Sequence, residues 1–283
     1  MDNVIKALIQ NYNPKNDNEA KQALREVMQE IVLAGLSRSD FFEKAAFYGG
    51  TCLRIFHGLN RFSEDLDFAC ISKDRISIEE YFSYIKNEFL SFGIDVNLRV
   101  KKKEEQGVQS AFIDSNTQIL LLEAFSSDLS KNVIDNEKIK IKIEIDLDNP
   151  DGGTFERKYK MIPSPYQVTI FDESSLFAGK IHAIICRNYK NRVKGRDYYD
   201  YLFYVSKGSS INIEYLENKL KNSGKLSSSD KLTLEKIKDL LRNRFLETNY
   251  ELAVKDTINF VESNYDFSNW NKNFFISTLD YLK

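Results

Sequence analysis

The sequence predicts a protein that mixes strands and helices over residues 1–165 and is mostly helical over residues 166–283. Two patterns lead to this prediction. Segments with strand-like alternation all precede Pro163, and apolar residues at helical spacing dominate after Pro165. The first half fits an α+β or an α/β arrangement, with the helical half packed against it. Nothing around Pro163 has the composition of a long flexible linker.

The first half begins with an amphipathic helix over Asn18–Leu36, where apolar residues recur at three- and four-residue spacing. Phe47 and Tyr48 form a short strand, followed by a glycine turn and a short helix. Ser77 opens a capping-box motif that predicts a helix to Phe92. The remaining strands are predicted at Asp65–Ile71, Ile94–Val100, Ile119–Phe125 and Ile139–Leu147.

In the second half, Asp172 is placed to cap a helix that runs to Arg187. Gly- and Ser-containing breaks separate the helical patterns that follow. These patterns cover Arg196–Val205, Ile213–Lys221, Asp230–Phe245, Tyr250–Glu262 and Ser268–Leu282.

Composition excludes several classes of protein. Forty Lys and Arg against 42 Asp and Glu give a net charge of −2, which excludes a globally basic nucleic-acid binder but not a local basic groove. Three widely spaced cysteines form neither a disulfide framework nor a zinc or redox pair. The N-terminus lacks signal-peptide order, and no apolar run reaches the ~20 residues that a membrane span needs. We expect a soluble, cytoplasmic protein with no membrane partner.

Asp65 and Asp67 are the first candidate functional residues. They lie two apart in a strand pattern, so both carboxylates point to one face and repel unless a cation lies between them. Mg²⁺ is the usual cation in such sites, because it prefers oxygen ligands and bridges phosphates. The alternative is two exposed acids on an edge strand. The upstream Gly49-Gly50-Thr51 turn favours the functional interpretation, because backbone N–H groups at a helix start can cradle phosphate.

A third acid is expected from the Ile139–Leu147 strand, where Glu144 and Asp146 share one face. The sequence pattern does not decide which of these two residues is the third acid. The alternative is a half-exposed amphipathic strand, since Lys140 and Lys142 lie on the same face.

Residues 176–196 contain no acid, and they carry six basic residues in a chain that is nearly neutral overall. Lys180, on an otherwise apolar helix, could neutralise a triphosphate, and the Arg192–Arg196 cluster could contact triphosphate or RNA backbone. A solvated basic face is the alternative. Asp197 and Asp200 lie near each other at i and i+3, where one of them could orient Arg196 or a nucleophile.

Four blocks of the sequence together resemble the AbiEii/AbiGii toxin family of nucleotidyltransferase-fold proteins from bacterial toxin–antitoxin and abortive-infection systems. The blocks span Phe47–Asp200 in the family's order. They are Gly49-Gly50-Thr51-x-Leu53-Arg54, then Arg61-x-Ser63-x-Asp65-x-Asp67-Phe68, then Lys180, then Lys194-x-Arg196-Asp197-x-x-Asp200.

The resemblance implies an α+β fold with a DNA-polymerase-β-like core and a mixed sheet. It implies that Asp65, Asp67, Lys180 and Asp197 are needed for activity. Together with the patterns above, it gives Gly49, Gly50, Thr51, Arg61, Ser63, Lys180 and Arg196 as candidate nucleotide-binding residues. The candidate metal ligands are Asp65 and Asp67, with either Glu144 or Asp146 from the strand pattern as the third acid.

The implied reaction is Mg²⁺-dependent transfer of a nucleoside monophosphate from a nucleoside triphosphate to RNA, with the 3′ end of transfer RNA as one acceptor. A cognate antitoxin encoded nearby is an implied partner. Two alternatives use the same pocket: a kinase-like phosphotransferase and a non-catalytic nucleotide- or RNA-binding domain.

Overall fold

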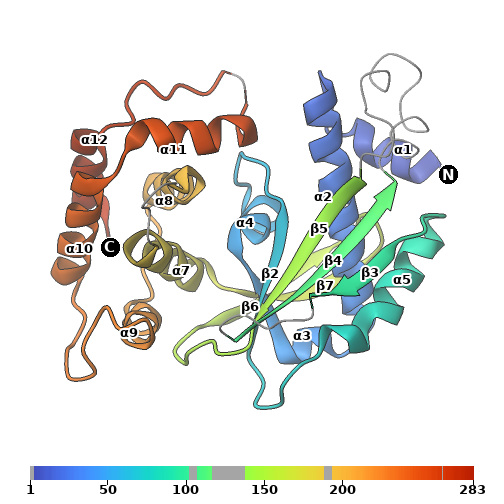
Figure 1. Ribbon diagram of the computed structural model, residues 1–283, viewed down its shortest axis with the longest axis horizontal. Coiled ribbons are helices and arrows are strands. Elements are labelled where there is room, and N and C mark those ends of the chain that lie inside the picture. The colour runs from blue at the N-terminus through green and yellow to red at the C-terminus, as the bar shows by residue number, and fades with distance from the viewer. Residues whose placement is uncertain (1–2, 102–106, 117–137, 188–192, 263) are drawn as a thin grey trace. The chain divides into compact units, whose positions relative to one another are not determined.

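The computed structural model describes residues 3–101, 107–116, 138–187, 193–262 and 264–283 of the chain (Figure 1). The chain forms two compact units. Unit 1 comprises Met1–Cys52, Phe62–Asp148 and Arg157–Ile170, and unit 2 comprises Leu53–Arg61, Asn149–Glu156 and Phe171–Lys283.

A mixed sheet, mostly within unit 1, joins seven strands of the described residues in the order β3-β4-β5-β2-β1-β7-β6. Strand β2 pairs in parallel with β5 and β1 in parallel with β7, while the β1–β2, β3–β4 and β4–β5 pairs are antiparallel. The predicted α+β class with a mixed sheet is therefore confirmed. The strands are β1 Ala45–Tyr48, β2 Asp65–Cys70, β3 Asn97–Val100, β4 Val108–Asn116, β5 Lys138–Asp146, β6 Phe155–Lys160 and β7 Tyr166–Phe171.

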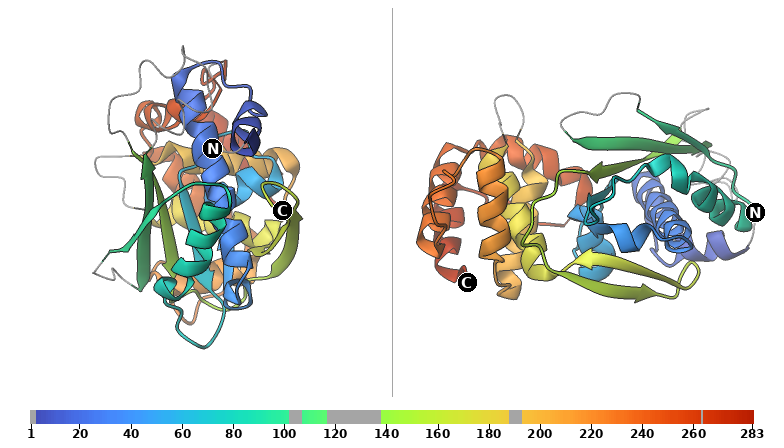
Figure 2. Two further views of the ribbon diagram at one scale, coloured as in Figure 1. Left: turned by 90° about the vertical axis from the view of Figure 1, so that its right-hand side faces the viewer. Right: turned by 90° about the horizontal axis from the view of Figure 1, so that it is seen from below.

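The helices of unit 1 cover the apolar face of the central strands. Leu66 and Phe68 on β2 are fully buried, as is Ile143 on β5, because alternate residues of a strand face the same side. Figure 2 shows α2 and α5 against this face of the sheet. The helical elements are α1 Asn3–Gln10, α2 Asp17–Ser37, α3 Phe41–Lys44, α4 Gly49–His57 (which ends in unit 2), η1 Ile78–Tyr81 and α5 Phe82–Ser91.

Unit 2 is mostly helical and has an aromatic core. This core includes the rings of Tyr198, Tyr201, Phe245 and Phe275. Three pairs have ring centroids 5.4 Å apart and pack edge-on or tilted: Tyr198–Phe275, Tyr201–Phe245 and Phe245–Phe275. Asp172 caps its first helix as predicted, because its side chain accepts a hydrogen bond from the Ser175 N–H. The helices are α7 Glu173–Cys186, α8 Gly195–Lys207, α9 Ile213–Asn222, α10 Leu234–Glu247, α11 Tyr250–Thr257, η2 Ile258–Phe260, α12 Lys272–Ser277 and η3 Thr278–Tyr281.

Several sequence-based element predictions need correction. The Ser77 side chain makes no capping hydrogen bond; instead the Ile78 N–H donates to Gln109 Oε1, and the segment begins as a 3₁₀ turn. Strands β4, β6 and β7 were not predicted, and the last two predicted helices each end in a 3₁₀ turn. The predicted strand at Ile119–Phe125 lies outside the described residues. Among those described, no helix is long and apolar enough to cross a bilayer.

Candidate active site

The junction of β1, α4 and β2 in unit 1 brings the glycine turn beside the acidic strand. Gly49 has a φ of +82°, and a Cβ at this position would overlap the Asp67 carboxylate, so only glycine fits here. Thr51, two residues into α4, is buried, and its hydroxyl donates to the Asp65 carbonyl at 2.5 Å. The start of α4 is thereby fixed to the strand that carries both aspartates.

The solvent side of the sheet carries a row of polar side chains centred on Asp67. The register pairs Asp67 with Tyr48 on β1 and with Glu144 on β5, and it pairs Glu144 with Ser110 on β4. Residues paired across a ladder project to the same face, so these four side chains are neighbours. We name Asp65, Asp67 and Glu144 the acidic row.

The register also separates the two candidates for the third acid. Glu144 is paired with Asp67, whereas Asp146 is paired with Ala69, one step further along the sheet. The Asp146 carboxylate accepts a hydrogen bond from its own loop, at the Asp148 N–H. Glu144 is therefore the acid that the sheet sets next to Asp67.

Lys142 supplies a positive charge to the acidic row. It is paired with Asp65 in the register, and its Nζ lies 2.7 Å from Glu144 Oε1. Partial burial disfavours the ammonium, but the hydrogen bond to Glu144 and the charges of Glu144, Asp65 and Asp67 outweigh it, so the pKa of Lys142 is raised. A cation is thus stable beside these carboxylates.

Gln29 on α2 holds the segment that leads into β2, and sequence analysis missed it. Its side-chain amide is almost fully buried and donates to the carbonyls of Ser63 and Glu64, at 3.1 and 2.9 Å. The signal was a polar residue within an apolar stretch of helix. Ser63, an expected nucleotide-binding residue, is partly exposed.

Unit 2 contains a buried charge network around Lys180. The Lys180 Nζ lies 2.8 Å from both Asp197 Oδ1 and Asp200 Oδ2. Arg61 forms a two-pronged pair with Asp200, with both nitrogen–oxygen distances at 2.6 Å, and Arg187 donates to Asp197. We name these five residues the lysine network.

Charge balance within the lysine network sets its pKa values. Burial alone would raise the pKa of Asp197, but the charges of Lys180 and Arg187 lower it to about 2. The pKa of Asp200 is also lowered, because Arg61 and Lys180 outweigh its burial. Lys180 has a raised pKa, since the two carboxylates outweigh its own burial. All five groups are charged at neutral pH.

Arg196 lies apart from the lysine network within unit 2. Its Nε is 3.5 Å from Asp256 Oδ2, and its guanidinium lies 3.8 Å from the centroid of the Phe260 ring. Asp256 on α11 is thus an acid that faces Arg196, whereas Asp197 pairs with Lys180 and Arg187.

The chain matches the family model for the AbiEii toxin, described as a nucleotidyl transferase of a type IV toxin–antitoxin system, over residues 31–272. The chain belongs to the AbiEii family. Among curated proteins, no sequence matches it significantly.

Three solved structures share the fold of this chain. MenT4, a nucleotidyltransferase toxin from Mycobacterium tuberculosis H37Rv, is similar with a TM-score of 0.62 and 16% identity, over 98% of this chain and 88% of that chain. A putative nucleotidyltransferase from Helicobacter pylori has a TM-score of 0.53 and 18% identity, over 90% of this chain and 92% of that chain. JHP933 from Helicobacter pylori has a TM-score of 0.51 and 16% identity, over 92% of this chain and 90% of that chain.

The residues quoted for the AbiEii resemblance fall into two groups in the structure. Gly49, Gly50, Thr51, Asp65 and Asp67 are gathered within unit 1, and Glu144 joins them. Arg61, Lys180, Asp197 and Asp200 are joined by ion pairs within unit 2.

Proposed function

We propose that this AbiEii-family chain transfers a nucleoside monophosphate from a nucleoside triphosphate to an RNA acceptor, in a reaction that depends on Mg²⁺. The observation that carries the proposal is the acidic row beside the start of α4, where Asp67 directly adjoins Gly49. Carboxylates for a metal and free N–H groups for phosphate are the two elements that nucleotide transfer requires.

The donor chemistry of the acidic row fits Mg²⁺. Its carboxylate oxygens are hard ligands of the kind that Mg²⁺ prefers, and the row already pairs with one cation, the Lys142 ammonium 2.7 Å from Glu144 Oε1. Among the described residues, no group of three or more metal-binding side chains is already gathered into a coordination site. We propose Asp65, Asp67 and Glu144 as the ligands. Bound Mg²⁺ would neutralise and orient the triphosphate.

The chain's own groups would bind and orient the nucleotide. The first N–H groups of α4, at Gly50 and Thr51, would donate to phosphate oxygens, which the positive end of the helix dipole also favours. The Thr51 hydroxyl is committed to the Asp65 carbonyl, so it would hold the acidic strand in place.

Lys180 and Asp197 are proposed as residues of the same reaction, on the basis of the family resemblance. Their charges are fixed at neutral pH by the lysine network, so Lys180 is a cation able to stabilise developing phosphate charge. Arg61, which is bonded to Asp200 within a buried pair, is proposed to position this network.

Asp65→Ala tests the proposal. We expect it to abolish transfer of label from an α-³²P nucleoside triphosphate to total RNA, and to abolish growth arrest in the host. Asp74→Ala, which removes an exposed carboxylate just after β2, is the matched control and should transfer label like the wild type. An Asp65→Ala protein as active and as toxic as the wild type would end the assignment.

The position of the label separates the alternatives. Transfer from the γ-³²P position alone would identify a kinase-like phosphotransferase that uses the same residues. The absence of transfer from either position, with metal-dependent triphosphate binding retained, would identify a non-catalytic nucleotide-binding domain.

Membership in a toxin family of toxin–antitoxin systems implies a cognate antitoxin. We propose that it is encoded next to this gene and that the toxin acts in the cytoplasm on RNA, with transfer RNA as one acceptor. Sequencing of the labelled RNA would identify the acceptor and the modified end.

A further inference from the structure

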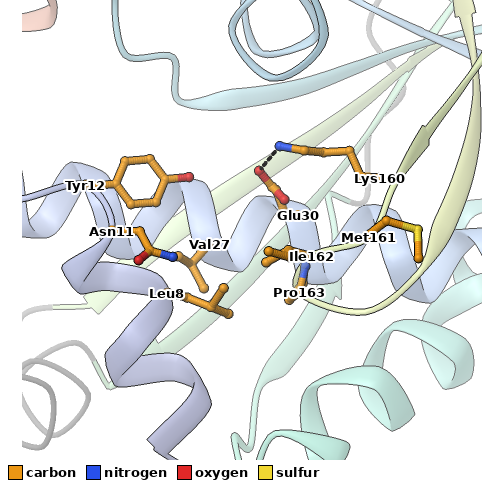
Figure 3. A pocket seen from close by; sticks show the side chains of 9 residues that line it. All are labelled: Leu8, Asn11, Tyr12, Val27, Glu30, Lys160, Met161, Ile162 and Pro163. Carbon is orange, nitrogen blue, oxygen red and sulfur yellow. Dashed lines mark hydrogen bonds and ion pairs between the residues drawn. The ribbon is translucent and has the colours of Figure 1, made fainter.

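Unit 1 contains a pocket between α1, α2 and the β6–β7 hairpin (Figure 3). Its two charged side chains neutralise each other, since Lys160 Nζ donates to Glu30 Oε1 at 2.9 Å. The other lining side chains are mostly apolar, so the pocket does not discriminate between classes of ligand. Unit 2 has a surface where charge is in excess, and that surface selects the charge of a ligand.

Four basic residues of unit 2 lie around the C-terminal ends of α7 and α9. Arg187 is the C-cap of α7, and Lys219 lies in the last turn of α9. Lys225 follows the end of α9, and Arg244 lies in the last turn of α10. We name Arg187, Lys219, Lys225 and Arg244 the basic patch.

Side-chain contacts join the three helices at this position. His182 Nε2 on α7 lies 3.2 Å from Ser223 Oγ, the C-cap of α9, and Cys186 Sγ lies 3.4 Å from the same oxygen. From α10, Arg244 Nη2 donates to the Arg187 carbonyl at 3.0 Å. The basic patch is therefore one contiguous part of unit 2.

The charges of the basic patch act on the two titratable groups at the α7–α9 contact. Burial and the positive charges of Lys219 and Arg187 lower the pKa of His182 to about 4, so this side chain is uncharged at neutral pH. Burial raises the pKa of Cys186, and the charges of three patch residues oppose that rise. Both effects are those of a positive potential.

Carboxylates close to the basic patch do not cancel its charge. Asp197, which pairs with Arg187, is shared with Lys180. The Glu247 side chain is 73% exposed and lies 4.0 Å from Arg244, so this pair is weak. Lys225 is exposed and, within the described part of the chain, has no carboxylate partner.

Stabilisation of helix ends is the alternative explanation for these cations, because positive charge is favoured near the C-terminus of a helix. It accounts for Arg244, which donates to a carbonyl at the end of α7. It does not account for Lys225, which lies beyond the last turn of α9 and is exposed to solvent.

We propose that the basic patch binds the phosphate backbone of the RNA acceptor. Its cations are spread over the ends of three helices, which suits a polymer that carries a charge on every nucleotide better than one free phosphate. The exposed Ser223 hydroxyl is a further group of the kind that contacts backbone phosphates.

The inference rests on the proposed function and names the surface that would hold the acceptor. Arg187 belongs both to the basic patch and to the lysine network. An RNA strand bound on the patch would therefore lie beside the network that contains Lys180 and Asp197.

Fluorescence anisotropy of a labelled single-stranded oligoribonucleotide, titrated with the full-length protein in EDTA and without triphosphate, tests the proposal. Lys225→Glu and Ser223→Glu both introduce a negative charge at an exposed position, where folding tolerates it. We expect each to weaken binding roughly tenfold, because repulsion of phosphate is added at the patch. Lys272→Glu, at an exposed lysine of α12, is the matched control and should bind RNA like the wild type.

The salt dependence gives a second measurement. The logarithm of the wild-type affinity should fall linearly with the logarithm of salt concentration, and Lys225→Glu should reduce this slope by about 0.7, the value for one lost contact to a single strand. The same slope in both proteins would show that Lys225 contacts no phosphate.

The proposal is overturned if both patch variants bind the oligonucleotide like the wild type. It is also overturned if a polyglutamate peptide binds more tightly than the oligonucleotide and is weakened by the same variants, which would identify an acidic protein as the partner. Because neither metal nor triphosphate is present, such a failure is separate from the outcome of the Asp65→Ala transfer assay.

Discussion

Asp67 lies where three elements of unit 1 meet, with Gly49 of α4, Tyr48 of β1 and Glu144 of β5 as its neighbours. The contact with Gly49 leaves no room for a Cβ, so the glycine turn and the acidic strand constrain each other. The register between β2 and β5 places Glu144, and not Asp146, directly beside Asp67.

Glu144→Ala and Asp146→Ala test this distinction. We expect Glu144→Ala to lower the transfer rate about 100-fold, as removal of one preorganised charge-stabilising group does, and Asp146→Ala to change it less than threefold. Single-turnover transfer of α-³²P label would measure both. Equal losses, or a larger loss for Asp146→Ala, would contradict the assignment of Glu144.

Asp197 gives the lysine network a predictable pH dependence. Its pKa in the folded protein, about 2, is below the value of about 4 in an unfolded chain, so its stabilising contribution is full above pH 4 and is lost as the pH falls toward 2. Over this range the free energy of unfolding should fall about 2 kcal/mol more in the wild type than in Asp197→Asn. Urea unfolding of both proteins at several pH values measures this difference. If the free energy of unfolding fell equally with pH in the wild type and in Asp197→Asn, the pairing of Asp197 with Lys180 and Arg187 would be contradicted.

At the scale of elements, α8 packs closely on α11 within unit 2 through Gly195, the first residue of α8. A Cβ on residue 195 would overlap the Ala253 carbonyl oxygen and the Thr257 hydroxyl. This contact sets the position of the helix that carries Asp197 and Asp200.

Gly195→Ala should therefore lower the free energy of unfolding by about 1–3 kcal/mol, because the backbone must shift to relieve the overlap. Gly179→Ala is the control, since a Cβ at that position in α7 meets nothing within 4 Å and removes the flexibility of a helical glycine. We expect it to be neutral or stabilising by up to about 1 kcal/mol. Thermal unfolding of both variants checks this, and similar melting temperatures would refute the close-packing explanation.

At the scale of the whole molecule, the two units place the candidate residues in two groups of different character. The acidic row of unit 1 faces solvent in part, which suits metal and substrate exchange. The lysine network of unit 2 is mostly buried, and its three cations outnumber its two carboxylates, which suits a fixed, preorganised positive charge.

Mg²⁺ together with a nucleoside triphosphate should raise the melting temperature of the full-length protein by several degrees, since a ligand that binds only the folded state stabilises it by mass action. Asp67→Asn should abolish this increase, while EDTA should reverse it in the wild type. An increase of the same size in Asp67→Asn would place the metal-dependent binding elsewhere.

The sequence alone determined the α+β class, most helices of unit 2 and the AbiEii membership, because helical periodicity and the motif blocks are local. That Asp65 and Asp67 share a face could also be predicted locally, because side chains two positions apart in a strand point to the same side. Strand β7 was missed although it pairs with the distant β1 in the centre of the sheet, and so was β6, which lies at the sheet edge beside β7.

Only the tertiary structure decided which groups meet. The neighbour of Asp67 is Glu144 because β2 and β5, separated by the whole β3–β4 hairpin, pair in one particular register. The partners of Asp200 are Arg61 and Lys180, which lie 139 and 20 positions away in the chain. Contacts between distant segments follow from packing and burial of the folded chain, and no local pattern of residues encodes them.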